Sequence, residues 1–93
     1  MGKSIHRAEY RVFVALLREH REQAAVTQVA LSEALGRSQS FVSDFERGQR
    51  RLDLIELRDV CEHIGLDLIE FVEEFEKRLR QVTVGRRGSK RTS

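Results

Sequence analysis

Apolar residues recur at spacings of three and four along most of the chain, which is the pattern of amphipathic helices. One such stretch covers residues 8–24, and its apolar face carries Tyr10, Phe13, Val14 and Leu17. Two short stretches follow within residues 27–48, and two longer ones cover residues 54–64 and 68–81. The pattern predicts an all-α fold of five helices.

Residues 27–48 predict two short helices joined by a tight turn. Thr27 is a favourable N-cap for the first helix, and Gly36 ends it, because a left-handed residue costs least without a Cβ. Ser38 is the predicted cap of the second helix, and Gly48 ends it. The predicted inward positions are Leu31, Ala34 and Leu35, then Phe41, Val42 and Phe45. Two capped helices around a glycine-containing turn form a helix-turn-helix.

The run T-Q-x-x-L-S-E-A-L-G-R-S-Q-S-F-V-S-D-F-E-R-G resembles the helix-turn-helix of the phage-repressor/Cro-like (Xre) family of bacterial regulators. The likeness continues through QRRLDLIEL and CEHIGLDLIEF, so that it covers residues 10–75. It implies a compact five-helix bundle of the phage-repressor DNA-binding domain type. In that fold the second helix of the motif enters the DNA major groove. The implied function is transcription regulation in a bacterium or phage.

The start of the second motif helix, predicted at residues 39–47, is expected to contact base edges. The candidates for base contact are Gln39, Ser40, Ser43 and Asp44. Gln39 can pair bidentately with an adenine edge, whereas the two serines discriminate weakly. Asp44 either accepts from cytosine N4 or pairs with a neighbouring arginine, Arg47 or Arg37.

Phosphate contacts are predicted around the motif, where the first motif helix begins and where the flanking turns carry arginines. The candidates are Thr27, Gln28, Arg37, Ser38, Gln49, Arg50 and Arg51.

Glu46 ends the second motif helix, where a carboxylate opposes the helix dipole. In relatives the matching glutamate pairs with an arginine of the first helix, which maps to Arg21. The resemblance therefore implies a partly buried, bidentate ion pair between Arg21 and Glu46. The family usually has glycine at the position of Ala25. Either Ala25 has positive φ at a cost of up to ~1 kcal/mol, or the turn differs locally.

The fourth and fifth helices each begin with a cap and an acidic residue three positions later, Asp53 with Glu56 and Asp67 with Glu70. The predicted buried stripe of the fourth helix is Leu54, Leu57, Cys61 and Ile64. In the fifth, a heptad-like seam contains Leu68, Val72, Phe75, Leu79 and Val82. The seam predicts a homodimer interface, since large apolar stripes seldom stay exposed. The alternative is that its last two residues fray in solvent.

Charge divides the chain into three parts. Residues 1–51 carry nine basic and six acidic groups (net +3), residues 52–77 two and nine (net −7), and residues 78–93 six and none (net +6). The acidic part cannot face phosphate closely, whereas the other two can. We expect one DNA-binding domain at residues 1–82 and a disordered basic tail at residues 83–93. The tail is either a solubilising or vector-derived end or an arm that binds DNA.

No constellation for catalysis, metal binding or a cofactor is visible in the 93 residues. The single cysteine excludes an internal disulfide and fits a reducing cytoplasm, and no apolar run reaches the ~18 residues of a membrane span. The leading interpretation is a dimeric, sequence-specific regulator, a repressor or autoregulator that reads a palindromic operator in double-stranded DNA. The alternative is an antitoxin-like module that binds a toxin or another basic protein through its acidic helices.

Overall fold

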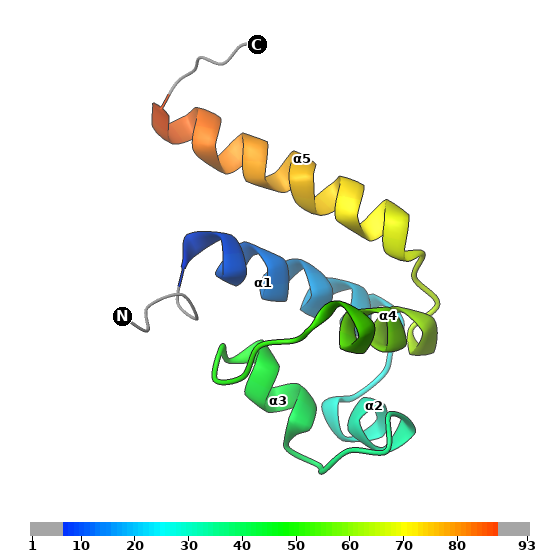
Figure 1. Cartoon of the computed structure of the whole chain (residues 1–93). Helices are drawn as coiled ribbons and strands as arrows, with labels where there is room; N and C mark the ends of the chain where they lie inside the picture. The colour runs from blue at the N-terminus through cyan, green and yellow to red at the C-terminus, as the bar shows by residue number, and fades with distance from the viewer. Residues whose placement is uncertain (1–6, 88–93) are drawn as a thin grey trace.

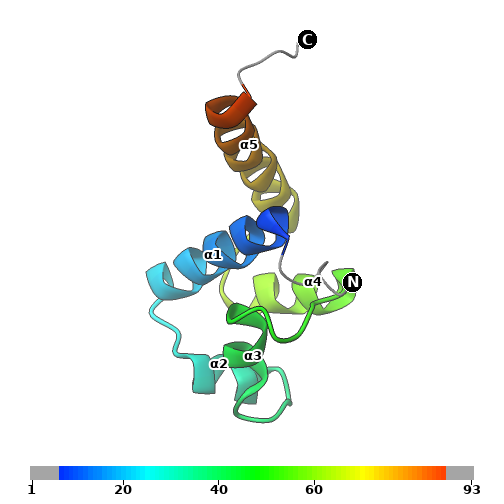
Figure 2. The same ribbon diagram turned by 90° about the vertical axis from the view of Figure 1, so that its left-hand side faces the viewer.

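The structure, a computed structural model, describes the backbone of residues 7–87 and the side chains of residues 7–82. Within that range the chain forms five helices and no strand, so the predicted all-α class is confirmed. The helices are α1 (Ala8–Gln23), α2 (Gln28–Ala34), α3 (Phe41–Glu46), α4 (Leu54–His63) and α5 (Leu68–Arg87). In both views α1 and α4 lie in the middle, with α2 and α3 on one side and α5 on the other (Figures 1 and 2).

The first four helices all end in the same way, with a residue of positive φ just after the last turn. These residues are Ala25 (61°), Gly36 (71°), Gly48 (78°) and Gly65 (70°). The next amide then bonds back into the helix, as from Val26 N–H to the Arg21 carbonyl at 3.3 Å. The turn after α1 therefore does require positive φ, and Ala25 carries the steric cost of a Cβ there.

The N-caps were predicted correctly at three helices and wrongly at one. Thr27 accepts from the Ala30 amide at 3.0 Å, Asp53 and Glu56 form a reciprocal capping box, and Asp67 accepts from the Glu70 amide at 3.0 Å. Ser38 does not cap α3, which begins at Phe41 instead of residue 39. The Phe41 amide bonds to the Ser38 carbonyl at 3.0 Å, so a separate tight turn precedes the helix.

The core lies where the five helices meet, with side chains from each of them. Its largest fully buried side chains are Phe45, Phe71, Leu16, Leu17, Leu31, Val42 and Val60. Two predicted inward positions were wrong. Ala34 is exposed, and Leu54 is 63% exposed because it opens α4 directly after an exposed cap; Val60 is buried on that helix instead.

Helix α5 extends further than its apolar pattern, to Arg87, so the predicted end of this helix at residue 81 was too early. Once a helix is formed, each added residue gains a hydrogen bond without repeating the cost of nucleation, and no core contact is needed. The rest of the predicted tail, residues 88–93, lies outside the described residues, as do residues 1–6.

Edge-to-face aromatic contacts and an ion pair attach α5 to α1. The Phe13 ring lies 5.9 Å from the Phe71 ring and 6.0 Å from the Phe75 ring, both edge to face. Arg78 pairs with Glu19 at 3.1 Å. Phe75 and Leu68, both predicted for a dimer seam, are partly buried against the core of their own chain. Of that predicted seam, Val72 and Val82 are 42% and 43% exposed, while Leu79 is partly buried.

Candidate nucleic-acid interface

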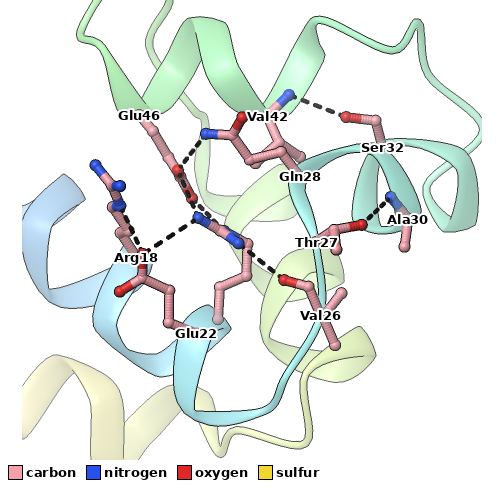
Figure 3. A network of polar contacts seen from close by, with 10 residues as sticks. Arg18, Glu22, Val26, Thr27, Gln28, Ala30, Ser32, Val42 and Glu46 are labelled. Carbon is pink, nitrogen blue, oxygen red and sulfur yellow. Dashed lines mark hydrogen bonds and ion pairs between the residues drawn. The ribbon is translucent and has the colours of Figure 1, made fainter.

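The crossing of α2 and α3 is fixed by a buried hydroxyl as well as by apolar packing. Ser32 of α2 is fully buried, and its Oγ accepts a hydrogen bond from the Val42 amide at 3.1 Å. That amide is one of the donors that a helix start leaves without an intrahelical partner. Ser32 therefore caps α3 from the neighbouring helix, the role that the sequence interpretation gave to Ser38 (Figure 3).

The end of α3 is held by a buried polar network, centred on Glu46 (Figure 3). The guanidinium of Arg21 donates from Nε and Nη2 to the two Glu46 oxygens, at 2.7 and 3.1 Å. Its Nη1 donates to the Val26 carbonyl at 2.8 Å. The Arg21 and Glu46 side chains are only 8% and 3% exposed, so the ion pair implied by the sequence resemblance is present and more deeply buried than expected.

Gln28 joins the same network from the first residue of α2. Its side-chain amide donates to Glu46 at 2.8 Å. The Glu46 carboxylate thus connects α1, α2 and α3. The contact also occupies the side-chain amide of Gln28, which the sequence interpretation assigned to phosphate.

The candidate base-contact residues lie in two settings. Gln39 and Ser40 are exposed in the turn before α3, not on the helix itself. Ser43 is half-buried and its hydroxyl donates to the Ser40 carbonyl at 3.0 Å. Asp44 pairs with Arg47 at 3.1 Å, the arginine partner that one of the two sequence interpretations gave it. We call residues 39–47 the reading segment.

The three arginines assigned to phosphate from sequence differ in their surroundings. Arg37 and Arg50 both pair with Glu56 of α4, at 3.2 and 2.9 Å. Both guanidiniums also lie over the Phe41 ring, 4.2 and 4.7 Å from its centroid. Arg51 instead lies over Tyr10, 5.1 Å from the ring centroid. Sequence reasoning had treated all three alike.

Two further candidates for phosphate contact already have partners in the structure. The Gln49 side-chain oxygen accepts from Arg47 at 3.1 Å, and the Ser38 and Ser40 hydroxyls lie 3.4 Å apart. Both segments remain exposed.

The pKa values of Glu56 and Tyr10, two groups near the reading segment, are shifted, the first by charged hydrogen bonds and the second by burial. The hydrogen bonds from Arg50, followed by those from Asp53 N–H and Arg37, lower the pKa of Glu56 to about 2 against the cost of burial. The carboxylate is therefore ionised at neutral pH. Burial raises the pKa of the Tyr10 hydroxyl, which donates to the Arg50 carbonyl at 3.0 Å.

Ser32, Tyr10 and the ion pairs of Glu56 were absent from the sequence-based site. Ser32 stands one helical turn after Gln28, which is the only signal that it faces α3. Tyr10 was read as a core residue, and Glu56 only as a capping residue. Their roles depend on contacts between residues that are distant in the sequence. Tyr10 and Arg50 are 40 positions apart, and Arg37 and Glu56 are 19 positions apart.

Other site types find no support in the described part of the chain. No group of three or more His, Cys, Asp and Glu side chains is arranged to hold a metal ion within it. Burial raises the pKa of the Cys61 thiol to about 11, as for an unreactive core thiol. No helix among residues 7–87 combines the length and apolar character needed to cross a membrane.

Known proteins that are similar to this chain in sequence or structure also contain a helix-turn-helix or belong to the regulators. Residues 12–73 match the family model described as a helix-turn-helix domain. An XRE-family like protein from Pseudomonas syringae pv. tomato str. DC3000 is similar in structure, with 45% sequence identity and a TM-score of 0.74, over 82% of this chain and 93% of that one. The clp gene regulator ClgR from C. glutamicum is 27% identical, with a TM-score of 0.67, over 76% of this chain and 91% of that one. The comparison with curated proteins finds no match.

The fold and the braced α2–α3 unit define a helix-turn-helix DNA-binding protein. The matching model covers more than half of the chain, and the Pseudomonas syringae structure is similar over most of it. The chain belongs to the Xre-type family of helix-turn-helix transcriptional regulators.

Proposed function

We propose that this regulator is a repressor or autoregulator that binds a palindromic operator as a homodimer and reads it with residues 39–47. The observation that carries the proposal is the bracing of α3 at both ends, by Ser32 at its start and by Arg21 at its end. A helix fixed in this way can present the preceding turn, with exposed Gln39 and Ser40, in one orientation to base edges.

Within the reading segment, Gln39 is the proposed base-reading residue. It is exposed, and its amide can donate and accept at once, as an adenine edge requires. Ser40 and Ser43 supply weaker polar contacts. Asp44 is already paired with Arg47, and we assign it to orienting that arginine ahead of contacting cytosine.

Phosphate contacts are proposed for the surface that surrounds the reading segment, at Thr27, Gln28, Ser38, Gln49 and Arg51. The acidic residues of α5 are kept away from this surface, since α5 lies on the opposite side of α1 and α4 from α2 and α3 (Figures 1 and 2). Glu56 of α4 does lie beside it, where its charge is paired with Arg37 and Arg50. This arrangement supports an orientation with α2 and α3 toward DNA.

The homodimer is proposed to form through α5. Exposed apolar side chains on this helix include Ile69, which is 72% exposed, together with Val72 and Val82. A two-fold dimer would set two reading segments about 10 base pairs apart, or a multiple of that, on one face of the duplex. Sedimentation equilibrium of the wild type and of Val72→Glu tests this step. A wild type that stays monomeric at tens of micromolar would exclude the dimer.

Selection of duplexes from a random DNA pool tests the proposal as a whole. We expect a two-fold symmetric sequence to emerge. Gln39→Ala should then weaken binding to that sequence by roughly 1–3 kcal/mol and binding to a scrambled duplex only slightly. The variant should also lose its preference at one base pair per half-site. Equal losses on both duplexes would show that Gln39 does not read a base. If no duplex is enriched, the interaction-module alternative, with α4 and α5 binding a protein partner, replaces this proposal.

A further inference from the structure

One carboxylate of α4 holds the two arginines that flank α3. Arg50 donates to Glu56 in a bidentate arrangement, from Nη1 at 3.1 Å and from Nη2 at 2.9 Å. Arg37, from the turn before α3, donates to the same group at 3.2 Å. Because both guanidiniums also lie over Phe41, the first residue of α3, the cluster joins α4 to the start of the reading segment and to the loop behind it.

Three of the five N–H donors of the Arg50 guanidinium are used for contacts within the protein. Its Nη1 donates a second hydrogen bond, to the Arg51 carbonyl at 2.8 Å, and its own carbonyl accepts from the Tyr10 hydroxyl. The Glu56 side chain is only 19% exposed. A phosphate that binds Arg50 in a bidentate way through its Nη groups would compete with the partly desolvated Glu56 carboxylate, and such pairs are among the stronger polar contacts.

Arg51, the next residue, differs from Arg50 in its exposure and in its contacts. It is exposed, and its guanidinium lies over the Tyr10 ring. Within the part of the chain that the structure describes, that guanidinium has no carboxylate or carbonyl partner. A cation–π contact uses no N–H donor, so the donors of Arg51 stay available to a phosphate, and the side chain has less freedom to lose on binding.

We propose that Glu56 is a positioning residue for DNA binding. It holds Arg50 and Arg37 against Phe41 to orient the reading segment, and so leaves Arg51, supported by Tyr10, as the phosphate-binding arginine of the loop 49–51. The inference rests on the proposed DNA-binding function. It differs from the sequence interpretation, in which Arg50 and Arg51 were equivalent phosphate ligands.

The adjacent arginines form a matched pair for the test. Arg50→Gln and Arg51→Gln remove the same charge from neighbouring positions. Each variant is titrated at several salt concentrations against a duplex selected with the wild type and against a scrambled duplex of the same composition. Unfolding in urea is measured in parallel. Both measurements use the whole chain.

Arg51→Gln should lower the salt slope by about one per bound subunit and weaken both duplexes alike, about five- to tenfold near 0.1 M salt. Its urea midpoint should not change. Arg50→Gln should leave the salt slope unchanged and lower the urea midpoint. An equal loss of slope in the two variants, with equal midpoints, would overturn the proposal.

Glu56→Gln separates positioning from structural support. Glutamine at this position can still bond back to the Asp53 amide, so the capping box is preserved while both ion pairs are lost. We expect a steeper salt slope, because Arg50 and Arg37 are released toward phosphate, and a fall of fivefold or more in preference for the selected duplex. A group with only a structural role would lower the urea midpoint without steepening the slope. An unchanged slope in Glu56→Gln would therefore contradict the inference.

Failure of the proposed function gives a different result. In that case the wild type would bind neither duplex at any salt concentration. The urea midpoints would still show whether Arg50 contributes to stability and Arg51 does not, since that part of the test needs no DNA.

Discussion

Replacement of Arg21 by alanine tests how much the buried network contributes to stability. The change removes two hydrogen bonds to Glu46, at 2.7 and 3.1 Å, and one to the Val26 carbonyl at 2.8 Å. Glu46, whose side chain is 3% exposed, is left with the neutral amide of Gln28 as its remaining donor in this network. A buried carboxylate without a cation is a large cost, because desolvation is no longer offset by the ion pair.

The expected loss is on the order of 3 kcal/mol. Breaking a buried pair by removing one partner typically costs about 3–5 kcal/mol, and we take the lower end because the Gln28 amide remains. A natural domain of this size has a total free energy of unfolding of roughly 5–14 kcal/mol. Arg21→Ala should therefore remove a large part of the stability and lower the urea midpoint clearly, with no change in the slope of the transition.

Arg18→Ala is the matched control on the same helix. Arg18 pairs with Glu22 at 3.0 Å, but its side chain is 57% exposed, and exposed pairs of this kind contribute about 0.3–0.5 kcal/mol. The two variants should thus differ several-fold in their effect on the midpoint. Equal, small effects would refute the reasoning, because they would mean that water screens the Arg21–Glu46 pair as well.

Three other outcomes are expected. Ala25→Gly should raise the free energy of unfolding by up to ~1 kcal/mol, because φ is 61° at this position. Ala24→Gly, at a φ of −80°, should not raise it, and urea unfolding of both variants checks the difference. Ser32→Ala should lower it by about 1–3 kcal/mol, since the Val42 amide loses its buried acceptor, and a midpoint within error of the wild type would argue against that cap. The pKa of Glu56 is about 2 in the folded chain against an ordinary 4.5, so its stabilisation is complete above pH ~4.5 and is lost as the pH falls toward 2. Glu56→Gln should flatten the stability profile in that window, and a profile identical to the wild type would exclude the assigned ion pairs.

Local signals predicted most of the fold. Asp53 and Asp67 stand before apolar-periodic runs with an acidic residue three positions on, and both act as caps in the structure. The start of α3 was not predictable in this way, because Ser38 and Ser40 are equally good cap types. The choice is made by a tertiary contact, from Ser32 to the Val42 amide, that leaves no mark in local spacing.

Only some contacts of the candidate site could be predicted from the sequence. The resemblance pointed to the Arg21–Glu46 pair and to the arginines around α3, and the pair is present. Which arginine is free depends on where Glu56 and Tyr10 lie, and both come from other helices. The end of α5 was missed for a different reason, since its last turns form by local hydrogen bonding beyond the apolar pattern.

The polar contacts around α3 are expected to set its direction, while Val42 and Phe45 supply its attachment to the core. Apolar packing alone tolerates small rotations, whereas a bidentate pair has a fixed geometry. This separation can be tested with Arg21→Met combined with Glu46→Leu, which fills the space with apolar groups of similar volume. Stability should return close to the wild-type value, because no buried charge remains.

Sequence preference, however, should not return in the double variant. Gln28 loses its acceptor on α3 together with the pair, so none of the hydrogen bonds that Glu46 makes to α1 and α2 remains. We expect the ratio of affinities for the selected and scrambled duplexes to fall, while the salt slope, set by phosphate contacts, stays the same. Measuring that ratio in a variant of normal stability separates the two roles. A fully retained ratio would show that apolar packing alone is enough to orient α3 on DNA.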